Sequence, residues 1–279
     1  MIDAPPVRRL LLGAALRRYR ENLGLTLEDA ARVLECDRSK ISRIETGQRG
    51  IRPKELRELL TEYGVDEQEA SALAAIVQAR RRGSRRRKQH HHGDAVSGPC
   101  WEYLTLEQAA SDIFTYDPQH VPDVLQTPQY ARATVTSDPS LPTDSAQDML
   151  TELNLSRQQI LEEQRPRVTA LIGETALREA TGDPDVMRDQ LRALAVASER
   201  IVVQVLPSGC RAPSSGPVTI LRFAGIPNLG AVYLPGLSGG TCLAGQQDVA
   251  SCTRAFEQLR ASALNPAASA RLIRDIAEG

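Results

Sequence analysis

The chain has 279 residues, of which 41% are hydrophobic and 25% are charged, a balance that is ordinary for a globular protein of about two domains. It contains neither a membrane-spanning apolar run nor a secretion signal, and its five cysteines include no C-x-x-C pair, so we expect a reduced, cytoplasmic protein. The net charge of −1 conceals an asymmetry: residues 1–93 hold 20 basic and 13 acidic side chains (+7), which leaves 14 and 22 (−8) for residues 94–279. A polyanionic partner is therefore expected at the N-terminal part.

Residues 1–79 are predicted to form five short helices. The predicted starts and ends are Val7 to Leu23, Leu27 to Leu34, Arg38 to Thr46, Pro53 to Gly64, and a fifth helix capped by Asp66. Thr26 and Asp29 have the spacing of a capping box, Asp37 is a good N-cap, and Gly24 suits a left-handed helix end. The first helix carries five arginines that we place on its outer faces, namely Arg8, Arg9, Arg17, Arg18 and Arg20. A tight turn at Glu35 and Cys36 between the second and third helices indicates a helix-turn-helix domain.

The third predicted helix turns Ile41 and Ile44 inward and leaves polar side chains on its solvent side. Such a helix enters the major groove of DNA, where arginine forks onto a guanine edge and serine serves several bases. The first amides of the second helix are placed for a phosphate. The predicted DNA-binding residues are Thr26, Arg38, Ser39, Lys40, Ser42 and Arg43. The alternative, a charged face that is merely solvated, is disfavoured by the combined spacing of caps, alanines, isoleucines and basic residues.

Two stretches, Leu16 to Thr26 and Ser39 to Gly47, resemble the Cro/cI (XRE) helix-turn-helix family. The second contains the Ile-x-x-Ile-Glu-x-Gly pattern of that family. The resemblance implies that Glu45 ties the third helix back to the domain. It also implies base-reading roles for Arg38, Ser39, Lys40 and Arg43.

Residues 80–99 are predicted to form a basic flexible linker. Arg80 to Lys88 hold seven positive charges in nine residues, which adds phosphate contacts or serves simply as a solvated tether. His90 to His92 and the later Cys100 match no standard zinc spacing, so no metal and no cofactor are expected.

Residues 100–279 are predicted to form an α+β domain around a small, partly antiparallel sheet, joined to the mainly α N-terminal bundle. Helices are predicted at 102–115, 144–164, 174–181, 185–199, 245–262 and 266–277. Strands are predicted at Val168–Ile172, Ile201–Leu206, Val218–Phe223 and Ala231–Leu234.

Several motifs in this region resemble the effector domain of actinobacterial antitoxin-like regulators (WhiJ-like, Scr-type). They are Glu107 followed by Tyr116, then Val121 to Ala133, Arg157-Gln158, Ile172 to Arg178, Gln190-Leu191 and Val203 to Pro207. The resemblance implies a regulator that is often encoded beside a small acidic partner protein. Two positions depart from the family pattern: no second aromatic residue adjoins Trp101, and no glutamate follows Tyr233.

The polar residues within these motifs are Tyr116, Gln126, Tyr130, Arg157 and Glu174. One interpretation is that they line a pocket for a ligand or partner. The favoured alternative is that they pair within the fold, Arg157 with a carboxylate and Gln126 and Glu174 with helix ends or backbone.

Gly236 to Gly240 satisfy the G-x-S-x-G pattern of a nucleophile elbow, but no histidine occurs after His120 to complete a triad. No phosphate-binding loop or dinucleotide fingerprint is present either, so we expect no enzyme activity and no catalytic residues. The sequence predicts a homodimeric transcriptional regulator that binds double-stranded DNA, makes no use of a membrane, and is controlled by a small acidic protein or small-molecule effector. The alternative is an antitoxin-like interaction module whose DNA binding is autoregulatory.

Overall fold

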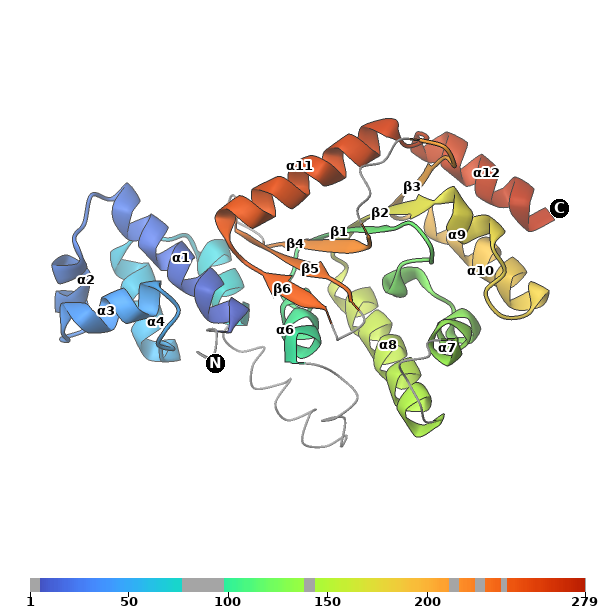
Figure 1. Ribbon diagram of the computed structural model, residues 1–279. Coiled ribbons are helices and arrows are strands. Elements are labelled where there is room, and N and C mark those ends of the chain that lie inside the picture. Colours follow the sequence, from blue (N-terminus) through green and yellow to red (C-terminus); the bar gives the residue numbers. More distant parts are fainter. Residues whose placement is uncertain are drawn as a thin grey trace.

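The computed structural model describes residues 6–76, 98–137, 144–210, 216–223, 229–236 and 240–278. A helical N-terminal part lies beside a C-terminal part that is built on a sheet with helices on both faces (Figure 1). Within the described residues, no helix has the length and apolar character needed to cross a membrane.

The N-terminal helices are α1 (Val7–Asn22), α2 (Leu27–Val33), α3 (Arg38–Glu45), α4 (Pro53–Glu62) and a helix at residues 67–76. The five-helix prediction is confirmed, with ends that shift by one or two residues. Three of the helix ends are followed by glycines with positive φ, at Gly24 (66°), Gly47 (73°) and Gly64 (61°). A side chain is strained in this left-handed region, so glycine ends each helix sharply.

The C-terminal part alternates helices and strands. Its helices are α6 (Gly98–Glu107), the 3-10 helix η1 (Asp123–Leu125), α7 (Pro128–Thr136), α8 (Asp144–Gln164), α9 (Glu174–Arg178), α10 (Pro184–Ala197), α11 (Gln246–Ser262) and α12 (Pro266–Glu278). Its strands are β1 (Asp112–Asp117), β2 (Arg167–Gly173), β3 (Val202–Leu206), β4 (Val218–Arg222), β5 (Gly230–Leu234) and β6 (Thr241–Leu243).

These strands form a mixed sheet in the order β3-β2-β1-β4-β5-β6. The pairs β1–β2 and β2–β3 are parallel, whereas β1–β4, β4–β5 and β5–β6 are antiparallel. The predicted fold class, a helical helix-turn-helix region followed by an α+β region with a partly antiparallel sheet, is confirmed.

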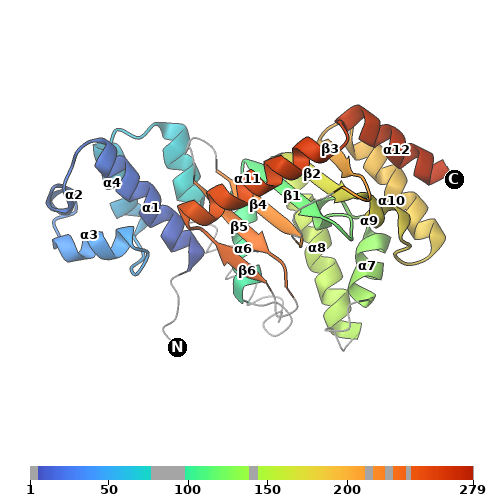
Figure 2. The same ribbon diagram turned by 45° about the horizontal axis from the view of Figure 1, so that its top comes forward.

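Helices cover both faces of the sheet. Helix α11 lies along one face of the sheet (Figure 2). Its Phe256 meets Phe114 of β1 edge-on, with ring centroids 5.7 Å apart. Helix α6 packs on β5 and β6 from the other face, where Tyr103 stacks on Tyr233 with centroids 4.4 Å apart. Helices α10 and α12 pack together, and α12 contacts the edge strand β3.

The helix predicted at 102–115 is wrong in its second half. The helix α6 starts at Gly98 and ends at Glu107, and residues 112–117 form β1, which lies between β2 and β4 in the sheet. The apolar spacing of α6 continues by chance into Ile113 and Phe114, which hides the change of period. The prediction also missed β6 and α7, although Thr127 and Pro128 form the N-cap and first turn of α7.

The two parts of the molecule share an apolar core. Helix α1 contacts both α6 and β5, and the backbone amide of Arg8 donates a hydrogen bond to the Glu102 carboxylate at 3.2 Å. Val7 and Leu11 of α1 belong to the same buried cluster as Tyr103 and Phe223 of the C-terminal part. A change at α6 or β5 therefore bears directly on the first helix of the N-terminal domain.

Candidate nucleic-acid interface

The start of α2 is held by a complete capping box. The Thr26 hydroxyl accepts from the amide of Asp29 at 3.2 Å, and the Thr26 amide donates to the Asp29 carboxylate at 2.7 Å. The Thr26 hydroxyl also donates to the Asp29 carboxylate at 2.6 Å, and this hydrogen bond together with the one from the Thr26 amide lowers the pKa of Asp29. The predicted box is confirmed, and it occupies the side chain of Thr26 that was also predicted to lie near a phosphate.

A tight turn then leads into α3. Glu35 takes a positive φ of 46°, and the amide of Cys36 donates to the carbonyl of Ala31 at 3.0 Å, which closes the turn where the sequence predicted it. Asp37 occupies the N-cap position of α3 but makes no side-chain capping hydrogen bond. That carboxylate therefore adds negative charge beside the start of the predicted recognition helix.

Helix α3 is anchored by two isoleucines and exposes a polar face. Ile41 and Ile44 are buried, at 1% and 2% exposure, whereas Arg38, Ser39 and Arg43 are exposed. Ser39 and Arg43 lie one turn apart, and the Arg43 guanidinium donates to the Ser39 carbonyl at 3.1 Å and to its hydroxyl at 3.3 Å. Ser42 is half-buried beside this pair of residues, between Ser39 and Thr46 on the same face.

Two of the predicted DNA-binding cations have acidic partners in the domain. Arg38 pairs with Glu28 of α2 at 3.1 Å, and both side chains are largely exposed. Lys40 pairs with Glu55 of α4 at 2.8 Å, and both of these side chains are about four-fifths buried, at 18% and 19% exposure. Lys40 thus joins α3 to α4, a contact that the charge pattern alone does not distinguish from a DNA contact.

The predicted anchoring role of Glu45 has a definite partner. The Arg20 guanidinium donates to both carboxylate oxygens of Glu45, at 2.7 and 2.8 Å, and to the Leu25 carbonyl at 2.8 Å. The hydrogen bond with Glu45 raises the pKa of Arg20. The prediction that Arg20 lies on an outer face of the first helix is wrong: it is 8% exposed, because it follows the buried Leu16 by one helical turn.

The end of α3 approaches α1 at very short range. A Cβ atom added to Gly13 would lie 2.5 Å from the carbonyl oxygens of Ile44 and Glu45. Glycine at this position therefore permits the two helices to cross, and Arg20 with Glu45 fixes the same crossing electrostatically. The polar face of α3 is presented from this rigid support.

In the C-terminal part, Arg157 is the centre of a polar network that we call the Arg157 network: Arg157, Glu107, Tyr103, Asp123 and Asn154. Arg157, Glu107 and Tyr103 are buried, whereas the Asp123 side chain is 53% exposed. The guanidinium binds both oxygens of Glu107 at 2.9 Å and donates to Tyr103 at 3.1 Å, Asn154 at 3.1 Å and Asp123 at 3.2 Å. The Tyr103 hydroxyl donates to Glu107. Burial opposes the charge on Arg157, but the Glu107 carboxylate outweighs it and raises the pKa of Arg157.

Of the other residues predicted to line a pocket, Gln126, Tyr130 and Glu174 also pair within the fold, and Gln126 reaches the Arg157 network through the Asp123 carboxylate at 3.5 Å. Gln126 donates to the Val121 carbonyl at 2.7 Å, and the buried Tyr130 hydroxyl accepts from the Val121 amide at 3.2 Å. Glu174 accepts from the Ser208 amide at 2.9 Å and pairs with Arg178 at 2.7 Å.

Tyr116 is buried on β1 in the apolar cluster beneath α11. Arg157, Gln126 and Tyr130 therefore meet at residues 121–126, whereas Tyr116 and Glu174 lie elsewhere in the fold. All of them except Tyr116 form hydrogen bonds or ion pairs within the fold that are given above.

Some of the sequence-based predictions concern residues that lie outside the described part of the structure. They are the basic run at Arg80 to Lys88, the histidines at His90 to His92, and Ser238 of the G-x-S-x-G stretch. Among the residues that are described, no group of three or more His, Cys, Asp and Glu side chains is arranged to hold a metal ion.

Comparison with known families finds one match in the helical N-terminal part of the chain and one in the sheet-containing C-terminal part. A helix-turn-helix domain model matches residues 11–73, which cover most of α1 and all of α2, α3 and α4 with the capped turn. A second model, described as a domain of unknown function (DUF5753), matches residues 101–275. No curated protein and no solved structure matches the chain significantly. The chain therefore belongs to the DUF5753 family, with a helix-turn-helix DNA-binding domain in front of the family domain.

Proposed function

We propose that the protein is a sequence-specific transcriptional regulator that reads double-stranded DNA with the exposed face of α3. The observation that supports this proposal is that α3 is fixed to the domain on one side and exposes polar side chains on the other. Ile41, Ile44 and the Arg20–Glu45 pair fix the helix, while Ser39 and Arg43 stay exposed one turn apart. A helix held in this way matches the shape and chemistry of the major groove.

The two exposed arginines are the principal candidates for base contacts. Their present partners, Glu28 for Arg38 and the Ser39 oxygens for Arg43, are solvent-exposed interactions. Exposed pairs contribute at most about 1 kcal/mol, so either guanidinium can exchange its partner for a guanine edge. Lys40 has the lesser claim to a base contact, because its partly buried pair with Glu55 joins α3 to α4.

A gel-shift assay tests this assignment. The full chain is titrated on the DNA upstream of its own gene, beside an Arg38→Ala/Arg43→Ala variant and an Arg132→Ala control. Arg132 pairs with Asp148 on the surface of the C-terminal part, remote from α3 in sequence and fold. We expect the double variant to lose the specific complex and the control to keep it. Equal binding by all three proteins would show that α3 is not the recognition helix.

We further propose that the protein acts as a homodimer in the cytoplasm. Two-fold related recognition helices would then reach half-sites one helical turn apart, about 34 Å. A footprint with two inverted half-sites, together with a dimeric mass in light scattering, supports this arrangement. A single protected half-site bound by a monomer would rule it out.

We also propose that the C-terminal domain controls DNA binding when it binds a small acidic partner protein or a small-molecule effector. The shared core supports this proposal, because α1 contacts α6 and β5 and the Arg8 amide binds Glu102. Helix α6 also carries Tyr103 and Glu107 of the Arg157 network. A partner or ligand that shifts α6 would therefore act on both the network and the DNA-binding domain.

A second candidate is an antitoxin-like interaction module whose DNA binding is autoregulatory. The internal pairing of Arg157, Gln126 and Glu174 favours this version, since these groups are already engaged and a protein partner needs no pocket. Co-purification of a partner at fixed stoichiometry supports the module, whereas stabilisation by a metabolite supports small-molecule sensing. In either version we propose that the chain acts by binding and not by catalysis.

A further inference from the structure

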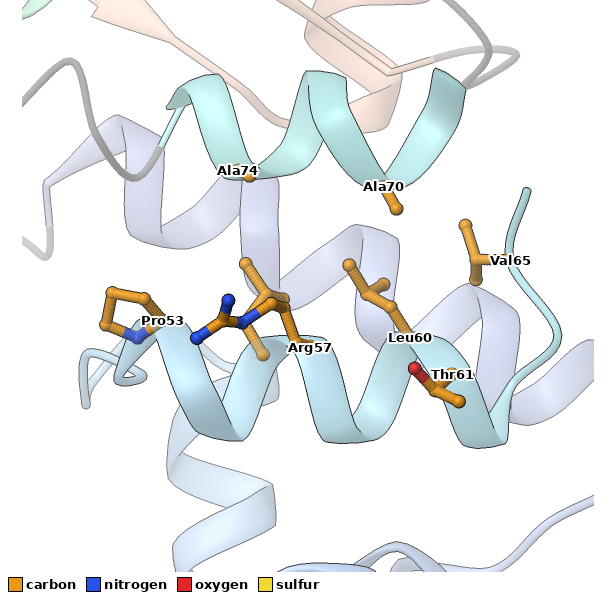
Figure 3. A pocket seen from close by; sticks show the side chains of 8 residues that line it. Pro53, Arg57, Leu60, Thr61, Val65, Ala70 and Ala74 are labelled. Atoms are coloured by element: carbon orange, nitrogen blue, oxygen red, sulfur yellow. The ribbon is translucent and has the colours of Figure 1, made fainter. Parts of the chain in front are cut away.

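The N-terminal domain contains a groove of about 280 Å³ between α4 and the helix at residues 67–76 (Figure 3). Leu56 and Leu60 of α4 form one wall, and Ala70 and Ala74 form the other. The two alanines lie one turn apart on the same helix face, and their short side chains leave the space between the helices open. An aliphatic cavity of about 150 Å³ is enough to hold benzene, so this groove has room for a ligand of about 10 to 15 non-hydrogen atoms.

A cation lies along this apolar groove. The side chain of Arg57 extends over α4 toward the end marked by Pro53, while Thr61 and Val65 lie at the opposite end (Figure 3). Arg57 is exposed and makes no hydrogen bond or ion pair with any residue that the structure describes. An unpaired guanidinium beside aliphatic walls is complementary to a carboxylate on a hydrocarbon body.

The other cation on the outer part of α4 is already paired. Lys54 lies 3.6 Å from the carboxylate of Glu58 on the same helix, and it does not line the groove. Arg57 is therefore available to an anionic group, whereas Lys54 is paired.

We propose that this groove binds a small amphipathic carboxylate, with its hydrocarbon between the leucine and alanine walls and its carboxylate on Arg57. The site lies in the DNA-binding domain and is distinct from any effector site in the C-terminal domain. Its occupant contacts α4, which also holds α3 through Glu55 and Lys40 at 2.8 Å. A shift of α4 would therefore change how α3 is presented, a consequence that rests on the proposed DNA-binding function.

Calorimetric titration of the full chain tests the binding step without DNA. The probes are octanoate and 4-butylbenzoate, with 1-octanol as the neutral analogue of the first. The variants are Arg57→Gln, which removes the cation, and Ala74→Leu, which fills the groove from an incompletely buried helix position. Lys54→Gln is the matched control, because it removes a positive charge from the same helix outside the groove.

We expect saturable binding of a carboxylate to the wild type and to Lys54→Gln with the same affinity. Loss of the bidentate charge-assisted contact should weaken binding about tenfold in Arg57→Gln, and octanol should not distinguish these proteins. Ala74→Leu should bind no probe. If this variant fails to fold in a circular-dichroism melt, the comparison of Arg57→Gln with Lys54→Gln decides alone.

Three results would overturn the proposal. The first is that neither acid binds saturably up to about 1 mM. The second is that octanoate binds Arg57→Gln as tightly as the wild type. The third is that Ala74→Leu alters the sedimentation coefficient of the chain and leaves octanoate binding unchanged, which would assign the groove to contact between copies. None of these results depends on whether the protein binds DNA, so they leave the proposed function to its own test.

Discussion

A buried arginine–glutamate pair lies in each part of the molecule, and the two pairs differ in what they connect. Arg20 and Glu45 join two short helices within 26 residues of sequence and hold the end of α3 against α1. Arg157 and Glu107 are 50 residues apart and join α8 to α6, with further bonds from Arg157 to Tyr103, Asn154 and Asp123. The first pair supports a surface, whereas the second forms part of the interior of the family domain.

The two arginine–glutamate pairs therefore have different structural roles. Near α3, fixing the helix leaves other side chains free to contact a polyanion. In the Arg157 network, each guanidinium nitrogen donates hydrogen bonds to other residues of the same domain. A buried ion pair is costly to break because the remaining charge stays unpaired. We therefore expect a loss of stability when either pair is broken, and a loss of DNA affinity as well when the pair beside α3 is broken.

The largest effect is expected for Arg157→Met. It leaves the Glu107 carboxylate, whose side chain is 1% exposed, without its counter-charge, and we expect the free energy of unfolding to fall by about 4 kcal/mol. Urea denaturation at pH 7 measures the loss. The double variant Arg157→Met/Glu107→Leu should recover most of it, and Arg132→Met at an exposed pair should lose under about 1 kcal/mol. A double variant no more stable than Arg157→Met would contradict the unpaired-charge explanation.

Arg20→Met is expected to cost somewhat less stability, about 3 kcal/mol, because Arg20 has fewer partners than Arg157. Its second effect distinguishes the two regions. At a temperature where the variant remains folded, DNA affinity should fall, since α3 has lost its tie to α1. Normal DNA affinity in folded Arg20→Met would mean that the pair does not position α3.

Gly13→Ala tests the close approach that accompanies the Arg20–Glu45 pair. The added methyl group would meet two carbonyl oxygens at 2.5 Å, so α1 and α3 must move apart, at a cost of about 2 kcal/mol. The exposed neighbouring position provides the control: Ala14→Ser should change the free energy of unfolding by no more than about 0.5 kcal/mol. Equal free energies of unfolding for Gly13→Ala and Ala14→Ser would show that α1 and α3 do not approach each other this closely at Gly13.

The smallest effect concerns the link between α3 and α4. Burial of Glu55 opposes its ionisation, but Lys40 and the Arg52 amide outweigh burial and hold its pKa below the ordinary value of 4.5. A carboxylate with a lowered pKa in the folded state stabilises the protein at pH values above 4.5, and this stabilisation is lost as the pH falls through its folded pKa. Glu55→Gln should therefore lower stability at pH 7 by under about 1 kcal/mol and make the decline toward pH 3 shallower. An unchanged slope in acid would show that the pair contributes nothing.

Local signals predicted the N-terminal domain well. The Thr26–Asp29 box, the turn at Glu35 and the glycine at 24 each act within a few residues, and each was found where the spacing placed it. The partner of Glu45 was missed because an arginine among five on one helix looks solvent-exposed until its position relative to Leu16 is considered. Lys40 was ambiguous for a related reason: its partner lies on another helix.

The C-terminal part was predicted less completely because its key contacts are long-range. Strand β1 follows α6 without a proline or glycine to separate them, and its neighbours in the sheet come from residues 167–173 and 218–222. The sequence favoured a carboxylate partner for Arg157 but did not identify it, since Glu107 is brought close only by the packing of α6 on the sheet. The groove at Arg57 had no sequence signal, because it arises from two alanines opposite two leucines.

Sequence recognition by α3 is decided by the ratio of specific to non-specific DNA affinity at fixed salt. Fluorescence anisotropy would compare the protected upstream sequence with a shuffled duplex of equal length for the wild type and for Arg38→Ala/Arg43→Ala. We expect a wild-type ratio of at least about 10³ that falls toward unity in the variant, while affinity for the shuffled duplex changes little. A variant that keeps the wild-type ratio would contradict the claim that the exposed face of α3 reads the DNA sequence.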